Sequence, residues 1–135
     1  MNPSRDKKTI LVIEDDSDIA RQIGRQLRLE GVNVLTTAWG EEALQWVHQR
    51  TIDLITLDMT LPDISGVEVL RRLKADKTTC NIPVVIVSII REQNGENWGA
   101  SERVTRPFAV EKLIASVRQT LKLKQTDPSA LNSLT

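Results

Sequence analysis

The chain has 135 residues, and its 18 basic and 18 acidic side chains cancel at neutral pH. This length suits one domain with a sizeable core, and the charge balance gives no reason to expect nucleic acid or an anionic membrane as the main partner. The single cysteine, Cys80, excludes an intrachain disulfide and a cysteine-based metal site, which is typical of a reducing compartment. No apolar run is long enough to span a membrane, and the polar first residues do not form a signal peptide. We therefore expect a cytoplasmic location.

Short apolar runs alternate with helical patterns along the chain. Buried-type strands are predicted over residues 9–13, 32–36, 54–57 and 84–87, with a fifth, short strand at 103–106. Helices are predicted from a cap at Asp16 or Ser17 up to Gly31, and over residues 41–49, 66–74 and 110–123. Residues 89–99 hold at most a short helix. This alternation predicts an α/β fold with a doubly wound parallel sheet and right-handed crossovers.

The sequence shows no internal repeat and no second domain. Residues 1–8 are polar and predict a disordered N-terminal arm, and residues 9–123 contain all the predicted elements. Residues 124–135 include Asp-Pro-Ser and read as a C-terminal tail or linker. We therefore expect one domain over residues 9–123.

The stretch from Asp53 to Gly66 organises the chain. Asp58 stands where the buried strand 54–57 should end, and Pro62 and Gly66 then favour a loop. In open α/β sheets, ligands bind outside the carboxyl ends of the strands, so a carboxylate there is well placed for chemistry. Capping of the next helix is better assigned to Asp63 or Ser65, which leaves Asp58 free for another role.

Charged and polar side chains follow the other strands at the same predicted edge. Glu14 and Asp15 follow the first strand, Ser88 the fourth and Arg106 the fifth. Crowded carboxylates repel one another unless a cation compensates, and an oxygen-only ligand set favours a hard cation such as Mg²⁺. Asp58 is a candidate nucleophile, Ser88 could hydrogen-bond a phosphoryl oxygen, and Arg106 could neutralise its charge.

Over about residues 8–123 the sequence resembles a response-regulator receiver domain of two-component signalling. The resemblance rests on four segments: Ile10-Leu-Val-Ile-Glu-Asp-Asp16, Leu57-Asp-Met-Thr-Leu-Pro-Asp-Ile-Ser-Gly66, Pro83-Val-Val-Ile-Val-Ser88, and Gly99-Ala100 leading to Arg106-Pro-Phe108. It implies a flavodoxin-like (βα)₅ sandwich, with a five-stranded parallel sheet of order 2-1-3-4-5 and helices on both faces.

The same resemblance assigns roles to the edge residues. Asp58 becomes the phospho-acceptor, and Mg²⁺ is held by Asp15, Asp58 and the Thr60 backbone carbonyl, and by Glu14 through water. Ser88 is the hydroxyl that follows the phosphoryl group, and Arg106 is the basic residue. The donor is a phosphohistidine on a histidine kinase or a histidine phosphotransfer domain, with no direct nucleic-acid or membrane contact. A homodimer through the helix 4–strand 5–helix 5 face is also compatible with the family.

Three positions depart from the family pattern. Arg106 replaces the usual Lys, Ile89 replaces a small residue and is expected to crowd the approach to Asp58, and Arg103 replaces an aromatic residue. The segment from Ser88 to Gly99 is also shorter than usual. The leading interpretation is a phospho-accepting switch that promotes its own phosphorylation and dephosphorylation without being a conventional enzyme. The alternative is a degenerate receiver, a phosphate-independent protein-interaction module.

Two enzyme classes fail on the sequence. A phosphatase of the haloacid dehalogenase type needs a second Asp two residues after the nucleophile, and Thr60 stands at that position. A flavodoxin needs a hydroxyl-rich phosphate loop after the first strand, where this chain has three acids that would repel a flavin phosphate.

Overall fold

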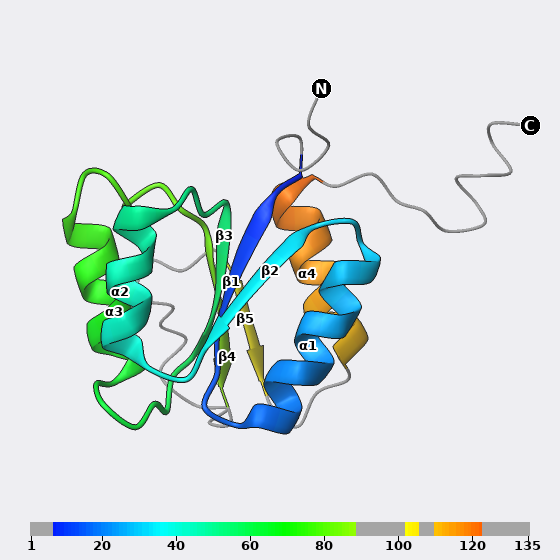
Figure 1. The fold of residues 1–135 in the computed structure, drawn as a ribbon, viewed down its shortest axis with the longest axis horizontal. Coiled ribbons are helices and arrows are strands. Elements are labelled where there is room, and N and C mark those ends of the chain that lie inside the picture. The colour runs from blue at the N-terminus through cyan, green and yellow to red at the C-terminus, as the bar shows by residue number, and fades with distance from the viewer. Residues whose placement is uncertain (1–6, 89–101, 106–109, 123–135) are drawn as a thin grey trace, which may run out of the picture.

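The fold is known from a computed structural model that describes residues 7–88, 102–105 and 110–122. Five parallel strands form one sheet in the order β2-β1-β3-β4-β5, which confirms the predicted order (Figure 1). The strands are β1 (Thr9–Ile13), β2 (Asn33–Thr37), β3 (Leu54–Asp58), β4 (Val84–Ser88) and β5 (Glu102–Thr105). Strands β1, β3 and β4 are therefore neighbours. The residues predicted at their carboxyl ends lie along one edge of the sheet: Glu14 and Asp15 after β1, Asp58 at the end of β3 and Ser88 at the end of β4.

The described helices cover both faces of the sheet, as the sequence predicted. They are α1 (Ser17–Leu29), α2 (Gly40–Gln49), α3 (Gly66–Ala75) and α4 (Val110–Leu121). Helices α2 and α3 pack on one face and α1 and α4 on the other (Figure 1). The Asp16 side chain accepts hydrogen bonds from the N–H groups of Asp18 and Ile19, so it is the cap that starts α1. The short helix considered for residues 89–99 lies outside the described residues.

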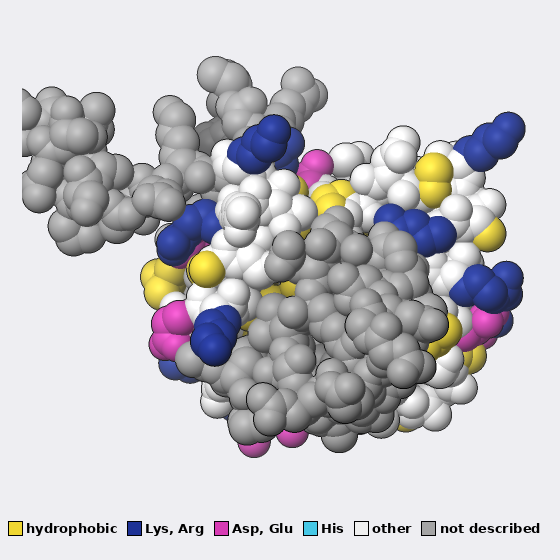
Figure 2. Space-filling model, turned by 180° about the vertical axis from the view of Figure 1, so that it is seen from behind, with side chains coloured by type: hydrophobic (Ala, Val, Ile, Leu, Met, Phe, Trp, Pro, Cys, Tyr) yellow, Lys and Arg dark blue, Asp and Glu magenta, His cyan; other side chains and the backbone are white. Residues whose placement is uncertain are grey.

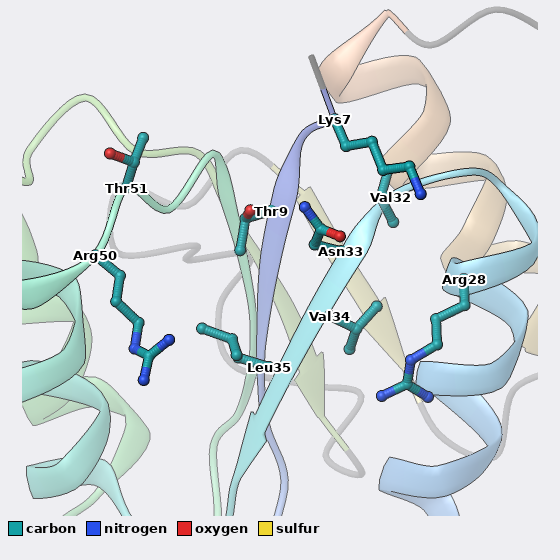
Figure 3. A pocket seen from close by; sticks show the side chains of 9 residues that line it. All are labelled: Lys7, Thr9, Arg28, Val32, Asn33, Val34, Leu35, Arg50 and Thr51. Carbon is teal, nitrogen blue, oxygen red and sulfur yellow. The ribbon is translucent and has the colours of Figure 1, made fainter. Parts of the chain in front are cut away.

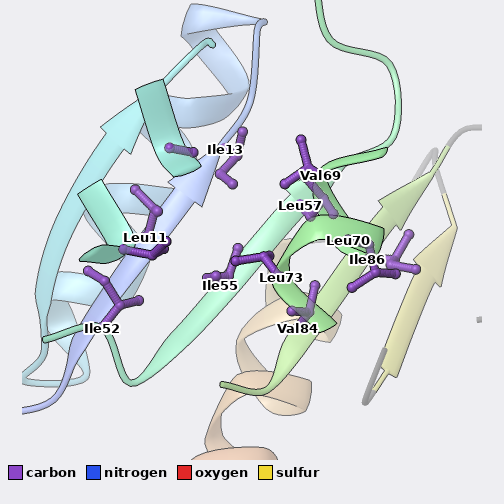
Figure 4. Close-up of a cluster of buried hydrophobic side chains, with 12 residues drawn as sticks. Leu11, Ile13, Ile52, Ile55, Leu57, Val69, Leu70, Leu73, Val84 and Ile86 are labelled. Atoms are coloured by element: carbon purple, nitrogen blue, oxygen red, sulfur yellow. The ribbon is translucent and has the colours of Figure 1, made fainter. Parts of the chain in front are cut away.

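Each face of the sheet has its own hydrophobic core, because successive strand residues point to opposite sides. Leu11 and Ile13 of β1 join the cluster under α2 and α3, where β3 and α3 contribute Ile55 and Leu70 (Figure 4). Ile10 and Val12 join the second cluster, under α1 and α4. Strands covered on both faces cannot show polar alternation, which explains the continuous apolar runs in the sequence.

Two strands begin one residue away from the predicted position. Strand β2 begins at Asn33, whose N–H donates to the Lys8 carbonyl at 2.8 Å, rather than at Val32. Gly31 has φ 84° after the end of α1, and Val32 is buried before pairing begins. Strand β5 runs over 102–105 instead of 103–106, and Arg106 lies outside the described residues.

A side-chain ion pair ties the last helix to the first. Arg118 of α4 donates from Nε and Nη2 to the two carboxylate oxygens of Glu30, at 2.7 and 2.8 Å. Glu30 is the C-cap of α1, and its side chain is largely buried. A two-pronged, partly buried pair of this kind holds α4 beside α1 more firmly than an exposed pair would.

The reverse side of the molecule does not present a continuous basic surface over the part that the structure describes. Figure 2 shows Lys and Arg side chains as separate groups, with acidic and apolar side chains between some of them. Among the described helices, none is long and apolar enough to cross a membrane.

Candidate functional site

Three carboxylates meet at the carboxyl edge of the sheet. Asp58 is the last residue of β3, and Glu14 and Asp15 directly follow β1. Strands β1 and β3 are neighbours with Ile13 opposite Leu57, so their next residues lie side by side. One oxygen from each carboxylate lies within 4.8 Å of the others. Glu14 and Asp58 are buried, with exposed fractions of 4% and 5%, whereas Asp15 is exposed.

Backbone hydrogen bonds hold this edge in place. The Thr60 N–H donates to Asp58 Oδ1 at 3.0 Å, and the Asp16 N–H donates to Glu14 Oε2 at 3.2 Å. The Met59 N–H donates to the Val87 carbonyl at 3.3 Å, which ties the residue after Asp58 to β4. The carboxylates are therefore presented by the ends of rigid strands rather than by a long loop.

The surroundings of Asp58 oppose its ionisation. Burial raises the pKa of Asp58 from 3.8 to about 8; the Thr60 hydrogen bond acts in the opposite direction, and Asp15 and Glu14 add to the rise. A buried carboxylate beside two others is disfavoured as an anion unless a cation shares the site.

The donor set fits a hard divalent cation. Three carboxylates offer oxygen atoms close together, and no described histidine or cysteine belongs to the group. Mg²⁺ prefers one to a few carboxylates and keeps several waters, which the exposed Asp15 side of the site leaves room for. Glu14, Asp15 and Asp58 are thus the residues that would hold the ion, and it would supply positive charge to the cluster.

The structure brings some predicted site residues together and leaves others undescribed. Ser88 ends β4 one residue beyond Val87, which is the register partner of Asp58. Its backbone therefore lies at the same sheet edge, beside Thr105 of β5. Thr60 follows Asp58 by two residues and is exposed. Arg106 and Ile89 lie outside the described residues.

Asp63 has a role that the sequence did not reveal. Ser65 caps α3, as one of the two predicted alternatives, but Asp63 caps α2 instead. Its Oδ1 and Oδ2 accept hydrogen bonds from the N–H groups of Gly40 and Glu41 at 2.9 and 2.8 Å. Burial alone would raise the pKa of Asp63, but these hydrogen bonds outweigh it and the pKa is lowered. The loop after Asp58 is thereby fastened to the start of α2.

We expect Asp63→Ala to lower the free energy of unfolding by about 1 kcal/mol, since two N–H groups at a helix start lose their acceptor. Urea unfolding followed by circular dichroism would measure the loss. Asp63→Asn keeps an acceptor oxygen and should lose less than Asp63→Ala. Equal stability of the wild type and the alanine variant would contradict this role.

Comparison with known proteins identifies the class that this fold and acidic edge define. Residues 10–118 match the family model of the response regulator receiver domain. The chain therefore belongs to the receiver domains of two-component response regulators, as its motifs predicted.

The individual relatives agree with the family. The chain is 38% identical over 125 residues to the uncharacterized transcriptional regulatory protein YkoG of Bacillus subtilis, covering 90% of this chain and 54% of that protein. It is 41% identical over 112 residues to the cell cycle response regulator CtrA of Brucella ovis, covering 80% and 47%. Among solved structures, the Thermotoga maritima response regulator TrrA, in complex with Mg²⁺ and BeF, has a TM-score of 0.75 at 29% identity and covers 83% of this chain and 97% of that one.

The chain spans about half the length of the curated relatives it matches.

Proposed function

We propose that this receiver domain accepts a phosphoryl group on Asp58 and uses it to switch a partner surface. The observation that carries the proposal is the buried Asp58 carboxylate at the end of β3, within 4.8 Å of the carboxylates of Glu14 and Asp15. Phosphoryl transfer to an aspartate requires that the carboxylate be positioned and that negative charge be neutralised. A buried carboxylate at a strand end meets the first requirement, and a cluster of carboxylates that could hold a metal ion meets the second.

The donor would be a phosphohistidine on a histidine kinase or a histidine phosphotransfer domain. An Asp58 carboxylate oxygen attacks phosphorus, a P–O bond forms and the P–N bond breaks. The histidine nitrogen keeps the electron pair of the broken bond and takes up a proton. Bound Mg²⁺ would neutralise charge on the phosphoryl oxygens and on the acidic cluster.

The remaining roles belong to residues around the transferred group. Asp15, Asp58 and the Thr60 carbonyl would hold the metal, with Glu14 acting through water. Ser88 would hydrogen-bond the phosphoryl group, and Arg106 would neutralise it with a planar, bulkier cation than the family's Lys. Ile89 would crowd the approach, so we expect slow phosphorylation by small donors and a long-lived product.

Intact-mass measurement tests the proposal directly. After incubation with Mg²⁺ and acetyl phosphate, or with a phosphorylated histidine kinase, the chain should gain the mass of one phosphoryl group. Asp58→Asn should abolish the gain, and Ile89→Ala should speed it. Asp18→Asn is the matched control, because Asp18 is an exposed acid in the first turn of α1, outside the cluster, and its loss should leave phosphorylation intact.

Absence of a phosphoryl adduct from either donor would overturn the proposal and favour the degenerate receiver, a phosphate-independent interaction module. The division into an arm at 1–8, a domain at 9–123 and a tail at 124–135 also stays a prediction. So do the cytoplasmic location and a homodimer through the face that the family numbers helix 4–strand 5–helix 5, which corresponds here to residues 89–99, β5 and α4.

A further inference from the structure

Strand β2 leaves one edge of the sheet open. It is the first strand in the order β2-β1-β3-β4-β5, so it has a neighbour on one side only. The Asn33 N–H donates to the Lys8 carbonyl, and the Thr37 carbonyl accepts from the Glu14 N–H, so Asn33 and Thr37 face β1. In a parallel pair alternate residues face the same neighbour, so the N–H and C=O groups of Val34 and Thr36 point outward.

A groove follows this open edge. Its main part measures about 710 Å³ and is lined by residues of β2 together with residues at the start of β1, near the end of α1 and directly after α2. A second hollow continues along Thr36, Thr37 and Ala38, and Arg28 lines both. Together the two hollows border all five residues of β2, and the second is also lined by Glu14 and Asp15.

Three cations surround the main part of the groove, and no acidic residue lines it. Lys7 lies at the amino end of β2, while Arg28 of α1 and Arg50 after α2 stand on opposite sides of the strand (Figure 3). None of these three side chains lies within ion-pair distance of a described carboxylate. The Arg50 guanidinium lies 5.8 Å from the centre of the Trp46 ring, which helps to hold it beside the groove.

We propose that the β2 edge binds an extended acidic segment of a partner protein as an added strand. The outward N–H and C=O groups of Val34 and Thr36 would supply main-chain hydrogen bonds. Successive residues of an added strand point to opposite faces, so two adjacent acidic residues would face Arg28 on the α1 side and Arg50 on the α2 side. A second copy of this chain does not fit, because pairing two β2 edges would bring both sets of cations together.

The main part of the groove, where the cations lie, is separate from the acidic edge in chemistry and in position, whereas Glu14 and Asp15 line the second hollow. Lys7 and Asn33 lie at the amino ends of β1 and β2, and Arg50 lies between α2 and β3, whereas Asp58 lies at the carboxyl end of β3. The proposal therefore does not depend on phosphorylation of Asp58, and the two can fail independently.

The test uses the full ¹⁵N-labelled chain and the capped peptide acetyl-Thr-Val-Glu-Glu-Val-Thr-amide. Peptide binding should shift the amide signals of β2 and slow hydrogen exchange at Val34 and Thr36. Leu35 is the internal control, because its N–H already faces β1 and should gain no protection. Added salt should weaken binding, since the attraction is between exposed charges.

Variants of the chain and of the peptide distinguish the contribution of charge attraction to binding from that of strand pairing. Arg28→Glu and Arg50→Glu should each weaken binding about fivefold, whereas Arg25→Glu, an exposed charge reversal on the same helix outside the groove, should not. A peptide with Gln in place of both Glu residues, or with N-methyl groups on its pairing amides, should lose binding. These two peptides leave the chain unchanged, so they test the proposal even where a variant folds poorly.

Three outcomes would overturn the proposal. In one, the neutral or N-methylated peptide binds as well as the acidic one. In another, the Arg28→Glu and Arg50→Glu variants bind like the wild type. In the third, a thymidine oligonucleotide binds the groove more tightly than the peptide without protecting Val34 and Thr36, which would identify a general polyanion site instead.

Discussion

Replacing Asp58 with asparagine is expected to stabilise the metal-free chain at pH 8 and to abolish most of its response to Mg²⁺. The carboxylate is buried and stands beside Glu14 and Asp15, and its pKa is raised from 3.8 to about 8. Asparagine keeps the shape and an oxygen that can accept the Thr60 N–H, but it carries no charge to bury.

The sign of this effect follows from the direction of the shift. In the unfolded chain Asp58 ionises near 3.8, whereas in the folded, metal-free chain it holds its proton up to about 8. Its favourable contribution to folding is thus fully present below about 3.8 and is lost as the pH rises to about 8. The difference between the variant and the wild type should therefore be small near pH 4 and largest at pH 8.

The expected gain in the free energy of unfolding is large for a single substitution, because Asp58 is buried. One pKa unit corresponds to about 1.4 kcal/mol, so the full shift would amount to several kcal/mol. Water entry and side-chain movement relieve part of that cost, and we expect a measured gain of about 1 to 3 kcal/mol for Asp58→Asn at pH 8. Urea unfolding in the presence of a chelator, at both pH values, would measure it.

Millimolar Mg²⁺ should then stabilise the wild type at pH 8, because the ion binds the folded acidic cluster. Asp58→Asn and Asp15→Ala should each lose most of this gain. Asp18→Asn is the matched control, because Asp18 is an exposed acid in the first turn of α1, outside the cluster. A wild-type chain that shows no saturable response, or one that persists in Asp15→Ala, would contradict the metal site.

The strands and the site edge were predictable because buried parallel strands leave a simple pattern. Leu54–Asp58 is a largely apolar run that ends in a charge, which is typical of a buried strand whose end reaches the edge of the sheet. The same reasoning located Glu14 and Asp15 after β1. The order of the strands came from the family resemblance, because local patterns do not say which strands are neighbours.

What the sequence could not reveal depends on contacts between distant segments. Asp63 caps a helix that begins 23 residues earlier, and no local pattern distinguishes such a cap from a cap on the next helix. The pKa of Asp58 depends on its burial and on how close Glu14 and Asp15 come to it, which a strand prediction does not contain. The groove at β2 combines Lys7, Arg28 and Arg50, which lie far apart in the chain and separately read as ordinary surface charges.

Gly66→Ala is expected to destabilise the fold and to weaken Mg²⁺ binding, although alanine favours helices over glycine. Gly66 is the buried first residue of α3, and its N–H donates to the Met59 carbonyl at 3.1 Å. An added Cβ would lie 2.6 Å from Met59 Cα and 2.8 Å from the Asp58 carbonyl oxygen. Both are backbone atoms, so either α3 or the segment that carries Asp58 must move.

We expect a loss of about 1 to 3 kcal/mol in the free energy of unfolding, which is typical of overpacking a buried contact. Displacement of the Asp58 backbone should also lower the affinity for Mg²⁺, because it would move the Asp58 carboxylate away from those of Glu14 and Asp15. Urea unfolding and a Mg²⁺ titration monitored by NMR would measure the two effects.

Gly24→Ala in α1 is the matched control. There an added Cβ would meet Arg28 Nη1 at 3.3 Å and Val34 Cγ1 at 3.7 Å, and the first is the end of a flexible side chain that can give way. This variant should be as stable as the wild type or gain up to about 1 kcal/mol from helix propensity, with unchanged Mg²⁺ affinity. If both alanine variants behave alike, the close approach of α3 to the Asp58 backbone does not position the site. If only Gly66→Ala loses affinity, the start of α3 holds Asp58 in the geometry that the acidic cluster needs.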